Sequence, residues 1–158
     1  MRWLWIDRVI EFESGEYAKA VKTISADDVL ANDHGPSWPV MPTSLIIEGV
    51  AQTGGLLVCE QTGFTISVVL AKIPRVQFSC DAVSGDTLTY TATIEQMRDG
   101  LAIVHGTSHN GIRLQADMEI VLAHVTSPEQ QELIDPGIFR EMMRIVGGFD
   151  LAAVRTGV

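Results

Sequence analysis

The stretch TSLIIEGVAQTGGLLVCEQ, residues 43–61, decides the fold. It contains no proline, and its apolar residues fall on nearly every side of a helix. A helix that is apolar all round has to be buried, so we expect the rest of the chain to wrap around this segment. Thr43 or Ser44 is expected to cap the start of the helix, and Gly63 is expected to end it.

A narrow polar stripe interrupts this helix. Ser44, Glu48 and Gln52 are spaced by four residues and therefore share one face. Two structural explanations are open: the stripe reaches solvent, or it forms a hydrogen-bond network inside the core. A catalytic explanation is also open, because a carboxylate among apolar neighbours loses hydration and is expected to hold a proton near neutral pH, as general acid–base catalysis requires.

The segment before the helix, residues 25–42, is rich in Asp, Asn, Gly and Pro and is predicted to be a long loop. Long loops in compact domains are uncommon and often functional. This loop holds His34, which is either a candidate catalytic residue or a loop histidine without a role. His105 and His124 fall in predicted strands and His109 at a hairpin tip, so they are weaker candidates.

Outside the helix and the loop, the apolar pattern has the period of two that is typical of strands. Turn signals separate the predicted strands at Ser14–Gly15, Ser84–Asp86, Asp99–Gly100 and Asn110–Gly111. In the last strand the even-numbered residues from Ile112 to Leu122 are apolar, which predicts one buried and one wet face. The predicted strands are 3–12, 17–24, 66–80 (one or two strands around Pro74), 87–94, 101–109 and 112–122.

The end of the chain returns to helix. Ser127–Gln130 fits a capping box with Pro128 at the first helical position, and Asp135–Pro136 starts a second helix that ends at Gly147–Gly148. The order of elements predicts an α+β fold in which an antiparallel sheet wraps around one long helix. We expect a single domain over residues 1–158, with a core at 1–126 and a helical C-terminal extension at 127–158.

Composition excludes several classes of function. The chain has 158 residues and a net charge of −9, so it should repel nucleic acid and anionic membranes. The opening MRWLWIDRV predicts neither a signal peptide nor a membrane span, which indicates a cytoplasmic protein. Cys59 and Cys80 are expected to be buried free thiols, a disulfide being the lesser alternative. No metal-binding or cofactor motif occurs, so neither a metal nor a cofactor is predicted.

Two groups of residues, one in the loop 25–42 and one in the predicted helix 43–61, resemble the active-site signature of a known family. His34, Pro36 and the run Pro39–Pro42, followed by the run Glu48–Gln52, are similar in order and spacing to the active-site signature of the 3-hydroxyacyl-[acyl-carrier-protein] dehydratases of the FabZ type. Gly35, Ser37 and Thr43 depart from that signature, which has phenylalanine, glycine and glycine at these places.

The resemblance continues on both sides of the signature. Leu4–Val9 resembles the opening of the family, and Ala71–Leu88 resembles its strand pair with the Gly-Asp-x-Leu ending. It covers about residues 3–125. It implies a hotdog fold and a homodimer with shared active sites, with hexamers also known in the family, in which His34 acts with Glu48 of the partner subunit.

The family's activity would be the dehydration of a 3-hydroxyacyl thioester, carried by acyl carrier protein or coenzyme A, to the trans-2-enoyl thioester. The resemblance gives His34 the role of base and Glu48 that of acid, with Gln52 orienting Glu48. Backbone N–H groups at Thr43 and Ser44 would bind the thioester carbonyl. The candidate substrate contacts are Pro36, Trp38, Pro39, Met41 and Pro42; Trp38 is an aromatic that the signature lacks, and packing is its equal alternative role. Acyl carrier protein is acidic, so docking would need a local basic patch, for which Lys72 and Arg75 are the candidates; scattered solubility charges are the alternative for both.

Two other functions are compatible with the same residues. One is a hotdog acyl-thioesterase, in which a carboxylate activates water. The other is a module that binds acyl thioesters without turnover, which the departures at Gly35 and Thr43 would favour.

Overall fold

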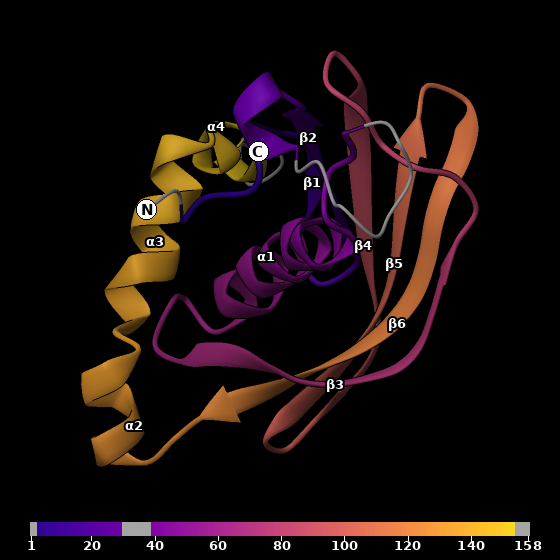
Figure 1. Ribbon diagram of the computed structural model, residues 1–158. Helices are drawn as coiled ribbons and strands as arrows, with labels where there is room; N and C mark the ends of the chain where they lie inside the picture. The colour runs from indigo at the N-terminus through magenta and orange to yellow at the C-terminus, as the bar shows by residue number, and fades with distance from the viewer. Residues whose placement is uncertain (1–2, 30–38, 154–158) are drawn as a thin grey trace.

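The structure, a computed structural model, describes residues 3–29 and 39–153. In this part of the chain, six antiparallel strands form one sheet in the order β1-β2-β4-β5-β6-β3. The sheet curves around the central helix α1, as predicted (Figure 1). The strands are β1 Arg8–Glu13, β2 Tyr17–Thr23, β3 Ser67–Phe78, β4 Thr87–Arg98, β5 Leu101–Asn110 and β6 Arg113–Val125; the helices are the 3-10 turn η1 Ala26–Asp28, α1 Thr43–Gln61, α2 Pro128–Leu133, α3 Pro136–Ile145 and α4 Gly148–Ala153.

Helix α1 runs from Thr43 to Gln61, as its composition predicts, and every residue from 49 to 59 is buried. Neither Thr43 nor Ser44 caps it, so that prediction is wrong: the residue before the first turn is Pro42, and no side chain bonds to the helix start. At the other end the expected glycine is confirmed. Gly63 has a φ of 63°, a conformation that glycine adopts without strain, and its N–H donates to the Glu60 carbonyl.

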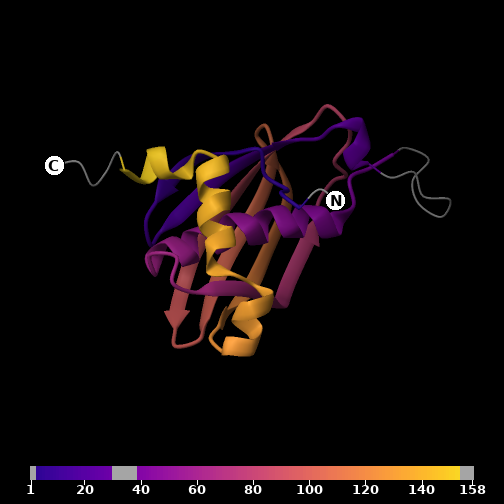
Figure 2. The same cartoon turned by 90° about the vertical axis from the view of Figure 1, so that its left-hand side faces the viewer.

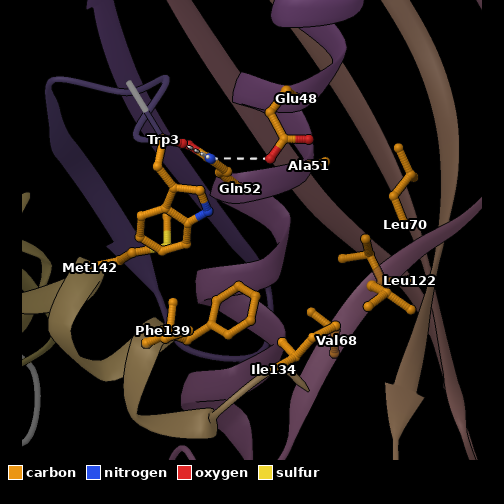
Figure 3. Close-up of a pocket in the computed structure, with 12 residues that line it drawn as sticks. Trp3, Glu48, Ala51, Gln52, Val68, Leu70, Leu122, Ile134, Phe139 and Met142 are labelled. Carbon is orange, nitrogen blue, oxygen red and sulfur yellow. Dashed lines mark hydrogen bonds between the residues drawn. The ribbon is translucent and has the colours of Figure 1, made fainter. Parts of the chain in front are cut away.

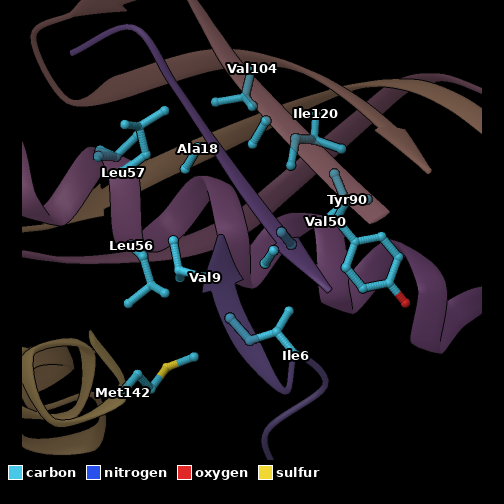
Figure 4. Packing of buried hydrophobic residues seen from close by; sticks show 14 of the residues in the cluster. Ile6, Val9, Ala18, Val50, Leu56, Leu57, Tyr90, Val104, Ile120 and Met142 are labelled. Carbon is cyan, nitrogen blue, oxygen red and sulfur yellow. The ribbon is translucent and has the colours of Figure 1, made fainter. Parts of the chain in front are cut away.

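Glycines at the contact between α1 and the sheet let side chains of one pack directly against the backbone of the other. A Cβ added at Gly49 would lie 2.4 Å from Cε2 of Tyr90, and one added at Gly106 of β5 would lie 2.3 Å from Cγ1 of Val50. Val50 and Tyr90 are fully buried at this contact (Figure 4). Tight packing of this kind fixes the rotation of α1 about its own axis.

Strand β6 corrects one sequence-based expectation. Its even-numbered residues face the core only from Ala116 onward, whereas Leu114 is exposed. The reason is a bulge at Gln115, since Ser108 pairs with Ala116 but His109 already pairs with Leu114. The extra residue reverses the alternation and buries Gln115, whose Nε2 donates to the Cys80 carbonyl at 3.0 Å.

The two predicted C-terminal helices are present, and a third short helix, α4, follows them. Ser127 and Asp135 accept hydrogen bonds from backbone N–H groups at the starts of α2 and α3. Helix α3 packs across α1, and α4 packs on β1 (Figure 2). Met142 and Met143 of α3 join the main core. Helix α3 of the extension therefore contributes to the hydrophobic core formed by α1 and the sheet.

A buried ion pair holds the turn η1 against β2. Lys22 Nζ lies 2.9 Å from Asp28 Oδ2, and only 1% of each side chain is exposed. The N–H and the hydroxyl of Ser25 donate to the same carboxylate. Burial alone would raise the pKa of Asp28, but the hydrogen bonds from Lys22 and Ser25 lower that pKa to about 2.

This pair makes stability depend on pH. Asp28→Asn is expected to lower the free energy of unfolding by about 3–5 kcal/mol at neutral pH, because Lys22 keeps its buried charge and loses its nearer and buried partner carboxylate, leaving only the more exposed Asp7 at 3.7 Å. Since the folded pKa of Asp28 lies below the value of about 4 of an unfolded aspartate, the stabilisation is complete above about pH 4 and is lost as the pH falls towards 2.

Urea denaturation at fixed protein concentration over this pH range measures the effect. Asp27→Asn is the matched control, because Asp27 is the exposed neighbour of Asp28. A penalty for Asp28→Asn that stays constant into acid, or that equals the penalty of the control, would contradict the role of the ion pair.

Candidate active site

A cavity of about 320 Å³ opens beside α1, on the side facing the C-terminal helices (Figure 3). Its walls are mainly apolar, and the polar side chains among them are Glu48 and Gln52. The cavity therefore has a polar end and an apolar end, an arrangement suited to a ligand with an apolar tail. Its lining consists of Trp3, Glu48, Ala51, Gln52, Val68, Val69, Leu70, Leu122, Ile134, Ile138, Phe139 and Met142.

Gln52 is the fixed centre of the polar end. Its Nε2 donates to the Trp3 carbonyl at 2.8 Å and to Glu48 Oε1 at 3.1 Å, and its Oε1 accepts from the N–H of Trp5 at 2.8 Å. Both amide hydrogens and the amide oxygen are therefore engaged. The side chain is 5% exposed and held in one orientation, so it fixes both the N-terminal segment and one oxygen of Glu48.

Glu48 is half-buried where the polar stripe reaches the cavity. Within the described residues its carboxylate makes no hydrogen bond or ion pair other than the one from Gln52. A carboxyl group has room for several hydrogen bonds, so Glu48 can still bind a ligand group. Each structural explanation of the stripe holds in part, because Ser44 is exposed while Gln52 belongs to a buried network.

A second cavity of about 260 Å³ lies at the start of α1. The first intrahelical acceptor is the Pro42 carbonyl, which receives hydrogen bonds from the N–H groups of Leu45 and Ile46. Helix geometry leaves the N–H groups of Thr43 and Ser44 without intrahelical partners, and the positive end of the helix dipole lies here. The lining consists of Val40, Met41, Pro42, Thr43, Ser44, Ile46, Cys80, Asp81, Ala82 and Gln115.

The predicted site residues that the structure describes are divided between the two cavities. His34, Pro36 and Trp38 lie outside the described residues. Within one chain, the remaining residues do not share a cavity. Glu48 and Gln52 line the first cavity, Met41, Pro42, Thr43 and Ser44 line the second, and Pro39 is half-buried and lines neither.

The two predicted docking residues, Lys72 and Arg75, are exposed on β3 but differ in electrostatic surroundings. Arg75 forms an ion pair with Asp117, which also contacts His105 Nε2 at 3.0 Å. Burial would raise the pKa of Asp117, but the hydrogen bonds from His105 and Arg75 outweigh it and lower that pKa. The charge of Arg75 is therefore offset, whereas Lys72 has no ion pair among the described residues.

Both cysteines are free thiols, as predicted, although Cys80 is only half-buried. Burial raises the pKa of Cys59 to about 12, which keeps the thiol protonated and unreactive. The described residues contain no group of His, Cys, Asp and Glu side chains arranged to hold a metal ion. In the same part of the chain, no helix is long and apolar enough to cross a membrane.

Sequence reasoning missed most of the cavity wall. Trp3 comes from the N-terminal segment, and Val68, Val69 and Leu70 come from β3. The sequence does contain a signal for the contribution of α3, because the apolar residues Ile138, Phe139 and Met142 are spaced so that they share one face of a helix. That pattern predicts a buried face but does not indicate which element covers it.

A curved antiparallel sheet around one central helix defines a hotdog protein. Similar solved structures include a hot-dog-like protein from Thermanaerovibrio acidaminovorans, with a TM-score of 0.65 and 19% identity over 78% of this chain and 90% of that chain. A mutant of the fluoroacetyl-CoA-specific thioesterase FlK gives a TM-score of 0.66 and 11% identity over 79% and 96%. At these identities the likeness shows the fold alone.

Sequence comparison then defines the family within this fold. The FabA-like domain matches residues 1–123, and the chain belongs to that family. The 3-hydroxyacyl-[acyl-carrier-protein] dehydratase FabZ of Symbiobacterium thermophilum is 34% identical over 130 residues, which cover 80% of this chain and 92% of the relative. The FabZ of Pelotomaculum thermopropionicum is 32% identical over 122 residues, 77% of this chain and 87% of the relative.

The Gln52 network predicts a loss of stability on substitution. Gln52→Met should lower the free energy of unfolding by about 1–3 kcal/mol, because the N–H of Trp5 loses its acceptor in a half-buried setting. Urea denaturation measures this, and Gln61→Met, which changes an exposed glutamine at the end of the same helix, is the control. Equal stability of the two variants would show that Gln52 does not anchor the N-terminal segment.

Proposed function

We propose that this protein dehydrates a 3-hydroxyacyl thioester to the trans-2-enoyl thioester. The observation that carries the proposal is the Glu48 carboxyl group, held by the immobilised Gln52 at the polar end of an otherwise apolar cavity. Such a cavity suits an apolar acyl tail that carries a hydroxyl group near its head. Membership of the FabA-like family and the likeness to FabZ dehydratases support the same reaction.

In the proposed reaction His34 takes the proton from C2. The electrons of that C–H bond are delocalised into the thioester carbonyl and then form the C2–C3 double bond as the C3–O bond breaks. Glu48 acts as the general acid and gives a proton to the departing hydroxyl group, which leaves as water. The N–H groups of Thr43 and Ser44 stabilise the negative charge that develops on the carbonyl oxygen.

The division of the site residues between two cavities supports a shared site in a homodimer. Strand β3 is at the edge of the sheet, with β6 as its neighbour. It exposes Leu70, Ile73 and Val76, each with more than a third of its surface accessible. An edge strand has unpaired backbone N–H and C=O groups that can pair with another strand. We therefore place a second copy on β3, so that His34 acts with Glu48 of the partner subunit.

The substrate carrier is proposed to be acyl carrier protein or coenzyme A in the cytoplasm. With a net charge of −9, the chain can bind an acidic carrier only where a local positive charge compensates. Exposed Lys72 supplies such a charge more readily than Arg75, which Asp117 already neutralises.

Removal of the proposed acid should abolish turnover without unfolding the protein. Glu48→Gln is expected to lower the rate of water loss by about 100- to 10,000-fold, which is the usual contribution of a general acid. Mass spectrometry of 3-hydroxyacyl thioesters measures the rate, and Glu60→Gln, which changes a half-buried glutamate about three turns further along α1, is the control. Full activity of a folded Glu48→Gln variant would refute the assignment.

The same assay distinguishes the two alternative functions. A thioesterase would release free thiol instead of losing water from the acyl chain. A binding module would bind acyl thioesters and leave them unchanged.

Mixing of two inactive variants tests the shared site. His34→Ala and Glu48→Gln subunits are each expected to be inactive alone, but a mixed dimer contains one site in which both residues are intact. Random exchange between the two homodimers should restore roughly one quarter of wild-type activity, because half of the dimers are mixed and each has one working site. No recovery after exchange, verified by native mass spectrometry, would show that the two residues act within one chain.

A further inference from the structure

One wall of the first cavity is built by residues that follow the family match. The FabA-like domain ends at residue 123, whereas Ile134, Ile138, Phe139 and Met142 all line the cavity. We infer that helix α3, through Phe139, closes the apolar end of this cavity and limits the length of the acyl tail that it accepts. The inference rests on the proposed function for the identity of the ligand.

The closure is a direct contact between Phe139 and Gly55. A Cβ added at Gly55 would lie 2.9 Å from Cε1 of Phe139 and 3.5 Å from Cγ2 of Val68. Glycine at this position thus lets the aromatic ring reach the surface of α1. Figure 3 shows the ring beside Val68 and Ile134 at the apolar end, away from Glu48 and Gln52 at the polar end.

The distance from the polar end of the cavity to the contact between Phe139 and Gly55 sets the length of the acyl tail that fits. Glu48, Ala51, Gln52 and Gly55 are spaced i, i+3, i+4 and i+7, so they lie along one face of α1. Seven residues of helix span about 10.5 Å. An extended chain advances about 3.4 Å for every three bonds, so roughly nine bonds fit between Glu48 and Phe139. The cavity therefore suits acyl tails of short to medium length.

The wall is fixed in place by contacts at both ends. Ser67 Oγ donates to the Ile134 carbonyl at 2.8 Å, which ties the segment before α3 to the start of β3. Arg140 donates to the Gly63 carbonyl at 3.2 Å and lies over the ring of Phe64, 5.7 Å from its centroid. Helix α3 is thereby held against the C-terminal end of α1, so Phe139 is positioned as a rigid barrier.

Binding of unreactive analogues to the full chain tests the inference. The probes are pantetheine amides of butyric, octanoic, dodecanoic and palmitic acid, in which an amide replaces the thioester, and calorimetry gives the Kd of each. For the wild type we expect affinity to rise to the octanoyl probe and to fall for the palmitoyl probe. Phe139→Ala should improve the Kd of the palmitoyl probe by roughly tenfold, the value of about two additional buried methylene groups.

Ile145→Ala is the matched control, because Ile145 lies on the same helix, is 57% exposed and does not line the cavity. Should Phe139→Ala fail to fold by circular dichroism, Phe139→Leu shortens the same side chain with less loss of packing and should shift the preference in the same direction. An unchanged length profile in the folded variant, or a wild type without any length preference, would overturn the inference.

The binding readout separates this inference from the proposed function. A wild type that binds the probes with the expected profile but dehydrates none of the 3-hydroxyacyl thioesters would refute the dehydratase while leaving the length limit intact. Dehydration with equal rates for all tails, together with a flat binding profile, would refute the length limit while leaving the dehydratase intact.

Discussion

The close packing of α1 against the sheet is the constraint on which the rest of the structure depends. The ring of Tyr90 packs against the backbone of α1 at Gly49, and Val50 packs against the backbone of β5 at Gly106, so side chains of each surface fit directly against the backbone of the other. This contact fixes which face of the helix is turned to the sheet. The opposite face, which carries Glu48 and Gln52, is consequently directed towards the N-terminal segment and α3. A rotated helix would place a carboxylate in the apolar core, at a large cost in free energy.

The polar stripe shows that structural and chemical roles can belong to one network. Gln52 uses all of its hydrogen-bonding groups, two of them on the backbone of Trp3 and Trp5, and thereby ties the N-terminal segment to the middle of α1. The same amide holds one oxygen of Glu48. Because every hydrogen-bonding group of Gln52 is engaged, the position of its side chain is well determined. The hydrogen bond from Gln52 therefore also positions Glu48, whose carboxyl group can still bind a ligand.

Local patterns predicted much of this structure, and long-range contacts account for what they missed. The bounds of α1, the antiparallel order and the grouping of Glu48 with Gln52 follow from spacing along the chain. The bulge at Gln115 does not, because it depends on contacts with Ser79 and Cys80, which follow the end of β3. Likewise, no pattern near Gly55 indicates that Phe139, more than eighty residues later, covers it. The role of His34 stays a prediction, since it lies outside the described residues.

The two ends of the cavity place different physical demands on the chain. The polar end requires directed hydrogen bonds, and Trp3, Gln52 and Glu48 meet at distances of 2.8–3.1 Å, so few substitutions can preserve it. The apolar end requires only volume and apolar surface, because the hydrophobic effect has no directional preference. A helix that lies beyond the family domain can therefore form the apolar end without disturbing the polar one. On the proposed function, the reaction depends on the family domain and the choice of acyl tail depends on the extension, so the second can change while the first is kept.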